Sequence, residues 1–310
     1  MRRYVAPFGA AKPLARAPPP LRRLFPAVPV LVQDAPAKLN LGLRVLWKRP
    51  DGFHDLETAF VPVGWADGLT AAPAETLTLA CSDASLPTDA SNLVVRAALA
   101  LARHAGVEPR AALTLVKRVP YGAGLGGGSA DAAAALRLLA RLWNLAVSEA
   151  ELHALAAGLG SDVPFFLLGA PALATGRGEV LTPLRRDDGT PWRCPFALVV
   201  AVPPVHVATA EAYRLVEPDA RPRPGLRAAI VSDDLGRWTR EVANDFEAPL
   251  VARHPAIGAA RDALREAGAG YAAMSGSGSA VFGAFEHAAQ AAVAAERLAV
   301  AGCRTWTDAV

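Results

Sequence analysis

The segment P-Y-G-A-G-L-G-G-G-S-A runs from Pro120 to Ala130 and joins a predicted strand at 111–116 to a predicted helix that should start at Ser129. Five of its residues 122–128 are glycine, which lacks a Cβ and allows positive φ, so successive backbone N–H groups can converge on one point. The helix adds unsatisfied N–H groups and the positive end of its dipole. The segment therefore predicts a polyphosphate-binding loop. A flexible turn is the alternative, but so many glycines lose much conformational entropy on folding.

The loop matches neither of the two common nucleotide-binding motifs. No lysine follows its last glycine, as in a P-loop, and no βαβ unit with a downstream acid surrounds it, as in the dinucleotide-binding fingerprint. We therefore expect a phosphate-binding loop of another class.

Two charged residues are candidates for a catalytic role. Asp162, in G-S-D-V-P-F-F (160–166), precedes a proline by two residues, which suits either the N-cap of a short helix or a general base beside the phosphate site. Lys38, in A-P-A-K-L-N (35–40), begins a strand whose alternation places Lys38 and Asn40 on one face. A lysine there could also extend from a sheet edge into solvent. Both interpretations are open for each residue.

Two further segments could contact a ligand. In R-P-D-G-F-H (49–54), Phe53 and His54 could stack on and hydrogen-bond a base, whereas the plainer interpretation is a hairpin turn with a surface histidine. S-G-S-G-S (275–279) is either a plain hairpin or a loop that lets the backbone approach a bound phosphate or sugar closely.

The composition excludes several classes of protein. The 310 residues, 52% of them hydrophobic, suffice for one large or two closely packed domains. No apolar stretch reaches the roughly 20 residues that a transmembrane helix needs, and a net charge of +3 gives no electrostatic footprint for nucleic acid. Cys81, Cys194 and Cys303 are scattered and odd in number, which excludes a disulfide framework and a cysteine-based zinc site. We expect a cytoplasmic protein without membrane or nucleic-acid partners.

The pattern along the chain divides it into three parts. Residues 1–33 hold seven prolines and six basic residues without periodicity, so we expect a disordered tail or a mis-assigned start of translation. From Asp34 onward, strands come first and helices are mixed in without regular βαβ alternation, which indicates the α+β class. A division near residue 190 would separate an N-terminal lobe, 34–190, from a C-terminal lobe, 191–310.

Taken in order, A-P-A-K-L-N, the glycine loop, G-S-D-V-P and S-G-S-G-S resemble the GHMP small-molecule kinases over residues 34–308. The resemblance implies a two-lobed α+β fold, with a ribosomal-protein-like N-terminal lobe that binds ATP and a ferredoxin-like C-terminal lobe that binds substrate. R-P-D-G-F-H and the G-G-G-S end of the loop are most similar to the branch that phosphorylates a cytidyl diphosphate sugar alcohol in non-mevalonate isoprenoid (terpenoid) precursor biosynthesis.

The resemblance also implies roles for single residues. Asp162 would accept the proton of the substrate's 2-hydroxyl, and Lys38 would hold the carboxylate and the nucleophile in register. Ser129 would lie near Mg2+. The residues implied to bind ATP are Pro120, Tyr121, Gly122, Ala123, Gly124, Leu125, Gly126, Gly127, Gly128, Ser129 and Ala130. The residues implied to bind substrate are Asn40, Phe53, His54, Gly276 and Gly278.

Two other functions are weighed against this one. The first is another GHMP kinase, acting on mevalonate or homoserine, but a substrate without a base has no use for Phe53 beside His54. The second is a catalytically silent nucleotide-binding sensor, which has no chemical reason to keep both Lys38 and Asp162. Many relatives carry Tyr at the position of Phe53, so stacking is kept here without the hydroxyl.

Overall fold

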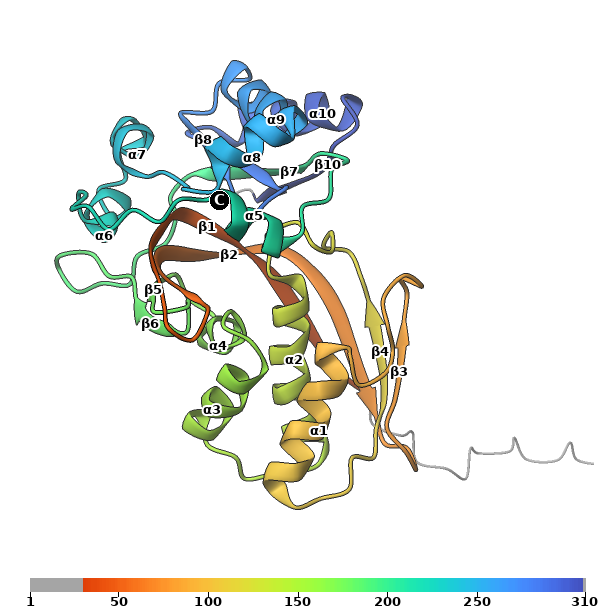
Figure 1. Ribbon diagram of the computed structural model, residues 1–310. Coiled ribbons are helices and arrows are strands. Elements are labelled where there is room, and N and C mark those ends of the chain that lie inside the picture. The colour runs from red at the N-terminus through yellow and green to blue at the C-terminus, as the bar shows by residue number, and fades with distance from the viewer. Residues whose placement is uncertain (1–29, 309–310) are drawn as a thin grey trace, which may run out of the picture.

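The computed structural model describes residues 30–308 (Figure 1). Residues 1–29, which make up most of the expected N-terminal tail, lie outside the described residues. The first strand begins at Leu31, three residues before the predicted start of order at Asp34, because residues 31–33 pair with the second strand. In the described part of the chain, no helix has the length and apolar character needed to cross a membrane.

The N-terminal half is a six-stranded sheet with helices packed on one face (Figure 1). A long antiparallel hairpin forms its spine, and the strands follow the order β3-β4-β2-β5-β6, with β1 paired to β2. Apolar side chains of α1 to α4 and of the sheet form a common core. The strands are β1 (Leu31–Lys48), β2 (His54–Ala72), β3 (Thr78–Cys81), β4 (Ala112–Val116), β5 (Ala172–Thr175) and β6 (Val180–Pro183). The helices are α1 (Leu93–Ala105), α2 (Gly127–Leu142), α3 (Glu149–Leu159) and α4 (Val163–Leu168).

The C-terminal half is a four-stranded antiparallel sheet in the order β10-β7-β9-β8, with α8, α9 and α10 over its outer face (Figure 1). The succession β7, α9, β8, β9, α10, β10 is the βαββαβ unit of the ferredoxin-like fold, as predicted. The strands are β7 (Ala197–Val202), β8 (Tyr271–Met274), β9 (Val281–Phe285) and β10 (Arg304–Asp308). The helices are α5 (Thr209–Leu215), α6 (Leu226–Ile230), α7 (Leu235–Glu241), α8 (Glu247–Arg253), α9 (Pro255–Glu266) and α10 (Ala288–Val300).

The two halves share a hydrophobic core. Leu198 and Val200 of β7 pack toward Val61 and Val63 of the long hairpin, whereas the alternate residue Val199 packs toward the C-terminal helices. Because side chains alternate along a strand, β7 is buried on both faces, which explains its uninterrupted apolar sequence. The shared core fixes the C-terminal sheet against the hairpin and so fixes the loops at their junction.

Several elements differ from the sequence prediction. The sequence of residues 246–267 predicts a helix, and the structure has two there, since Pro255 starts a new one. The helix expected from Ser129 begins at Gly127, with Gly126 as its N-cap. The connection between β6 and β7 contains residue 190, where the division between lobes was expected.

Candidate active site

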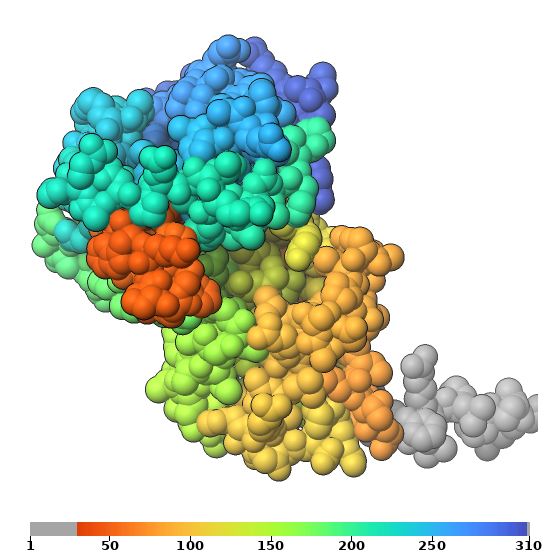
Figure 2. Space-filling model, in the orientation of Figure 1, coloured from red at the N-terminus to blue at the C-terminus, as the bar shows by residue number. Residues whose placement is uncertain are grey.

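A cavity of about 670 Å³ lies where the two halves meet. In Figure 2 the surface is hollowed between the orange-red tip of the β1–β2 hairpin, the teal segment around α5 and the first turn of α2. The wall comprises parts of β1 and β2, the glycine loop, the start of α4, the β5–β6 turn, α5 and the 275–279 loop. Segments far apart in the sequence therefore contribute to a single site.

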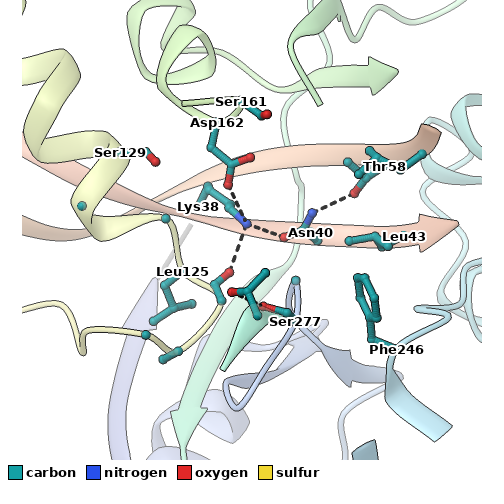
Figure 3. A pocket seen from close by; sticks show the side chains of 18 of the residues that line it. Lys38, Asn40, Leu43, Thr58, Leu125, Ser129, Ser161, Asp162, Phe246 and Ser277 are labelled. Carbon is teal, nitrogen blue, oxygen red and sulfur yellow. Dashed lines mark hydrogen bonds and ion pairs between the residues drawn. The ribbon is translucent and has the colours of Figure 1, made fainter. Parts of the chain in front are cut away.

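Lys38 of β1 is buried at the centre of this cavity (Figure 3). Its Nζ donates to Asn40 Oδ1 at 2.5 Å and to the carbonyl of Gly124 at 3.0 Å, and lies 3.6 Å from Asp162 Oδ2. Burial lowers the pKa of the Lys38 ammonium below its ordinary value, and Asp162 opposes that shift. The side chain does not extend into solvent, so the sheet-edge interpretation is wrong.

Asp162 occupies the N-cap position of α4 but does not cap the helix with its side chain. Its carboxylate, about one-third exposed, points instead toward Lys38 (Figure 3). A capping aspartate accepts a hydrogen bond from the first turn of its helix, and this one leaves its oxygens available to the cavity. The geometry therefore supports the functional interpretation of Asp162 over the structural one.

Asn40 connects Lys38 to both halves of the molecule. Its Nδ2 donates to Thr58 Oγ1 at 3.0 Å, which fixes its Oδ1 toward Lys38 (Figure 3). Its backbone N–H donates to Ser275 Oγ at 3.1 Å, and that hydroxyl donates in turn to the carbonyl of Gly124. The ammonium is thus held by partners that are themselves hydrogen-bonded, which limits its movement.

The glycine loop presents the start of α2 to the cavity. Gly126, with φ of 71°, is the N-cap, and no side chain caps the helix. Gly127, Gly128 and Ser129 form the first turn and line the cavity. Their N–H groups have no earlier helical carbonyl to bond to, so they are available to an anion, as predicted.

Gly124 has a second role, which is contact with the 275–279 loop. A Cβ at Gly124 would lie 2.2 Å from the carbonyl oxygen of Ser275, and its φ is 77°. The backbone N–H of Ala280 donates to the carbonyl of Ala123 at 3.0 Å. The two small-residue loops, far apart in the sequence, therefore support each other.

The structure places most, but not all, of the predicted site residues together. Gly276 lines the cavity beside Asn40, whereas Gly278 packs against Met274 and Leu250 and is not part of the cavity wall. Ala130 faces the core beneath the loop. The other predicted residues, Lys38, Asn40, Phe53, His54, Asp162 and those from Pro120 to Ser129, all line the cavity.

Aromatic side chains gather at the end of the cavity away from the glycine loop. The His54 ring stacks on Tyr213 of α5, with centroids 4.9 Å apart and an interplanar angle of 21°, and Tyr213 meets Phe246 edge to face. Phe53 is about half exposed, and the guanidinium of Arg177 lies over its ring. Burial, assisted by Lys48, lowers the pKa of His54, and burial raises the pKa of Tyr213 to about 12. Both rings are therefore neutral near pH 7.

Sequence reasoning missed several residues of the cavity wall. Thr58, Arg177, Tyr213, Phe246 and Ser277 all line it. Ser277 lay within a motif already singled out, S-G-S-G-S. Tyr213 and Arg177 lie in segments without any motif, and only the packing of α5 and of the β5–β6 turn brings them to Phe53 and His54.

A buried charge cluster lies beneath the glycine loop. Lys117 donates to Asp67 Oδ2 and, at 2.7 Å, to Asp131 Oδ2, while Asp67 Oδ1 accepts from the N–H groups of Arg118 and Val119. A Cβ at Gly127 would lie 3.4 Å from Lys117 Nζ, so the first turn of α2 rests on this cluster.

The cluster holds two carboxylates and one ammonium. Burial alone would lower the pKa of Lys117, but the two carboxylates outweigh burial and raise it. Burial raises the pKa of Asp131 to about 7. The Lys117 ammonium opposes this shift, and the neighbouring Asp67 carboxylate adds to it. Asp131 Oδ1 has no hydrogen-bond partner among the described residues.

Family comparisons cover both halves of the chain. Residues 92–170 match the family described as GHMP kinases N terminal domain, and residues 226–302 match GHMP kinases C terminal. The 4-diphosphocytidyl-2-C-methyl-D-erythritol kinase of Salinibacter ruber is 52% identical over 276 residues, which is 89% of this chain and 97% of that protein.

Solved structures are similar over the same extent. A crystal structure of 4-(cytidine 5'-diphospho)-2C-methyl-D-erythritol kinase has 38% sequence identity and a TM-score of 0.74, covering 89% of this chain and 98% of its own. Homoserine kinase from Cytophaga hutchinsonii shares the fold, with a TM-score of 0.66 and 18% identity over 93% of this chain and 98% of its own.

Proposed function

We propose that this chain, which belongs to the GHMP kinases, transfers the γ-phosphoryl group of ATP to the 2-hydroxyl of 4-diphosphocytidyl-2-C-methyl-D-erythritol, a step in isoprenoid precursor biosynthesis. The observation that carries the proposal is the order of features in one cavity. An uncapped helix start lies at one end, the Lys38–Asp162 pair at the centre and an aromatic cluster at the other end.

The ATP phosphates would bind at the glycine loop. The N–H groups of the first turn of α2 and the positive end of its dipole would neutralise phosphate charge without a mobile side chain. The helix rests on the buried Lys117 cluster and the loop on the 275–279 segment, so the donors are held in place before ATP binds. Preorganised donors matter here because phosphoryl transfer depends mostly on positioning and charge neutralisation.

Asp162 would act as the general base. Its oxygens are not used to cap α4, and the carboxylate faces the cavity between the glycine loop and the aromatic end. Lys38, 3.6 Å away, would orient that carboxylate and stabilise negative charge as the hydroxyl loses its proton. Asn40 and the carbonyl of Gly124 hold the ammonium in this position.

The cytosine would bind in the aromatic cluster. Phe53 is half exposed and offers a ring face, while Tyr213 supplies a second apolar wall against His54. Near pH 7 a neutral imidazole can donate one hydrogen bond and accept another, which suits the mixed edge of cytosine. Asn40 and the 275–279 loop at Gly276 would contact the sugar alcohol between base and phosphates.

Mg2+ is implied by the chemistry of ATP, and the residues present fit it. Mg2+ in phosphoryl-transfer sites is held through substrate phosphates, water and one or two protein oxygens. The Ser129 hydroxyl and the Asp162 carboxylate line the cavity, while the described residues contain no cluster of three metal-binding side chains. Ser129 would be its protein ligand, and the ion would neutralise charge on the transferred phosphoryl group.

The proposal assigns ATP chiefly to the lobe of residues 34–190 and the sugar alcohol partly to the lobe of residues 191–310, which contributes Tyr213 and Gly276. A cytoplasmic location accords with three unpaired cysteines in the described chain.

Release of ADP from purified protein and Mg-ATP tests the proposal. Turnover is expected with 4-diphosphocytidyl-2-C-methyl-D-erythritol and not with mevalonate or homoserine. Turnover with either of the latter would overturn the role given to Phe53, His54 and Tyr213. ATP binding without turnover on any of the three would favour a nucleotide-binding sensor.

A further inference from the structure

The turn between β5 and β6 places one arginine in the cavity. Residues 175–178 form a tight turn, in which the N–H of Gly178 donates to the carbonyl of Thr175, and the carbonyl of Gly176 accepts from Leu56 of β2. Gly176 and Gly178 have φ values of 68° and 108°. These contacts fix the turn against the hairpin and direct Arg177 into the cavity wall.

The turn that carries Arg177 lies beside both Phe53 and Asp162. Its guanidinium carbon is 4.9 Å from the centroid of the Phe53 ring. On the other side, a Cβ at the adjacent Gly178 would lie 3.7 Å from Asp162 Oδ1. A ligand that reaches from Phe53 to Asp162 would therefore lie beside the turn that carries Arg177.

Charge in the cavity wall is sparse. Among the residues that line the cavity, those with permanent charges are Lys38, Asp162 and Arg177. Lys38 and Asp162 offset each other. Arg177 bonds through Nε to Glu179 at 3.3 Å, but Glu179 does not line the cavity, and the two terminal nitrogens of the guanidinium make no hydrogen bond with the described residues. Glu179 offsets part of the charge of Arg177, so what Arg177 offers a ligand in the cavity is the two terminal nitrogens of its guanidinium.

We infer that Arg177 binds the diphosphate that joins the cytidine and the sugar alcohol of the substrate, an assignment that rests on the proposed function. A planar guanidinium matches two phosphate oxygens at once, and its stacking on Phe53 reduces the freedom lost when it binds. Arg177 would then select a cytidine diphosphate compound over a neutral cytidine, while Phe53, His54 and Tyr213 select the base.

Calorimetric titration of the full chain with CDP, cytidine and ADP tests this assignment. The quantity to compare is the ratio of CDP affinity to cytidine affinity, because a change in the packing of Phe53 affects both ligands and cancels. R177Q removes hydrogen bonds between a charged guanidinium and the diphosphate, so it should lower this ratio roughly 10- to 100-fold and leave ADP affinity unchanged. R177K keeps the charge but not the planar fork, so it should recover part of the ratio. R193Q removes an exposed arginine outside the cavity and should change neither value.

The outcomes separate this inference from the function on which it rests. If cytidine and CDP bind but R177Q leaves their ratio unchanged, Arg177 does not bind the diphosphate and the function stands. If R177Q weakens the binding of ADP as much as the binding of CDP, the arginine attracts any anion through its charge and the assignment is also wrong. If the wild-type protein binds ADP but neither cytidine nor CDP, the cytidyl substrate and this assignment both fail.

Discussion

Replacing Asp131 by asparagine should change the way in which stability depends on pH. Burial raises the pKa of Asp131 to about 7 in the folded chain, from an ordinary value of 3.8. A carboxyl group whose pKa is raised on folding favours the folded state at low pH, and this contribution is lost as the pH rises toward the folded-state pKa. The amide that replaces the carboxyl group in D131N would stay neutral at every pH, and its oxygen could still accept from Lys117.

The size of the effect follows from the two pKa values. A shift from 3.8 to about 7 is worth about 4 kcal/mol at most, and about 3 kcal/mol of it falls between pH 5 and pH 8. Relative to the wild type, D131N should therefore gain up to about 3 kcal/mol of unfolding free energy over this interval, and less where the native state relaxes around the charge.

Urea unfolding followed by tryptophan fluorescence, at pH 5 and pH 8, measures this difference. D188N is a matched control, because hydrogen bonds from Thr190 lower the pKa of the exposed Asp188 and place its titration below the interval. Its difference from the wild type should be the same at both pH values. An unchanged difference between D131N and the wild type at pH 5 and pH 8 would contradict this expectation, since Asp131 would then be ionised over the whole interval as a partner of Lys117.

Three further substitutions test the site. Asp162→Asn should lower kcat by about 10²- to 10⁴-fold with little change in KM for ATP, since it removes the proposed general base; an unchanged kcat would exclude Asp162 from the chemistry. Tyr213→Leu should raise KM for the cytidyl substrate and leave KM for ATP alone; equal rises in both would place Tyr213 outside base recognition. Gly124→Ala should lower the melting temperature, because a φ of 77° costs alanine about 1–2 kcal/mol and its Cβ would collide with the carbonyl of Ser275; an unchanged melting temperature would show that the two loops do not depend on their contact.

Local sequence signals predicted the elements that carry their own caps. The spacing of Ser148 and Glu151 predicts a capping box, and Gly106 predicts the end of the preceding helix. The structure confirms both: the capping box starts α3, and Gly106, with φ of 67°, ends α1. Ser91 comes before the apolar run at the start of α1 and predicts the N-cap of that helix, but the N-cap is the next residue, Asn92. Serine and asparagine both favour this position.

The sequence prediction missed or shortened the elements that depend on tertiary contacts. Strand β1 is predicted from residue 38 but begins at Leu31. Pro36 lies at a register shift, where the ladder tolerates the missing N–H donor, so the proline does not end the strand. The helices α5, α6 and α7 have only five to seven residues, too few for a helical period to be recognised. Strand β10 is short and half polar, and it is fixed by pairing with β7.

The candidate site shows the same contrast between residues with local sequence signals and residues placed by tertiary contacts. Lys38, Asp162 and the 120–130 segment lie in local motifs, so the sequence alone could single them out, and all but Ala130 line one cavity. Gly278 belongs to the same S-G-S-G-S motif as Gly276, but it packs against Met274 and does not line the cavity. Tyr213 and Arg177 enter the site through packing between segments, which no local pattern records.

The position of the transferred phosphate distinguishes the proposed reaction from any other use of the cavity. Phosphorus NMR of the product formed from 4-diphosphocytidyl-2-C-methyl-D-erythritol and Mg-ATP would show it. Carbon 2 of the erythritol bears a methyl group and no hydrogen, so a phosphate on its hydroxyl gives a new monoester signal without three-bond coupling to protons, beside an intact diphosphate. That signal is the expected result for transfer to the 2-hydroxyl. A proton-coupled monoester would place the phosphate on another hydroxyl, and loss of the diphosphate signals would mean that the cavity cleaves its ligand instead of phosphorylating it.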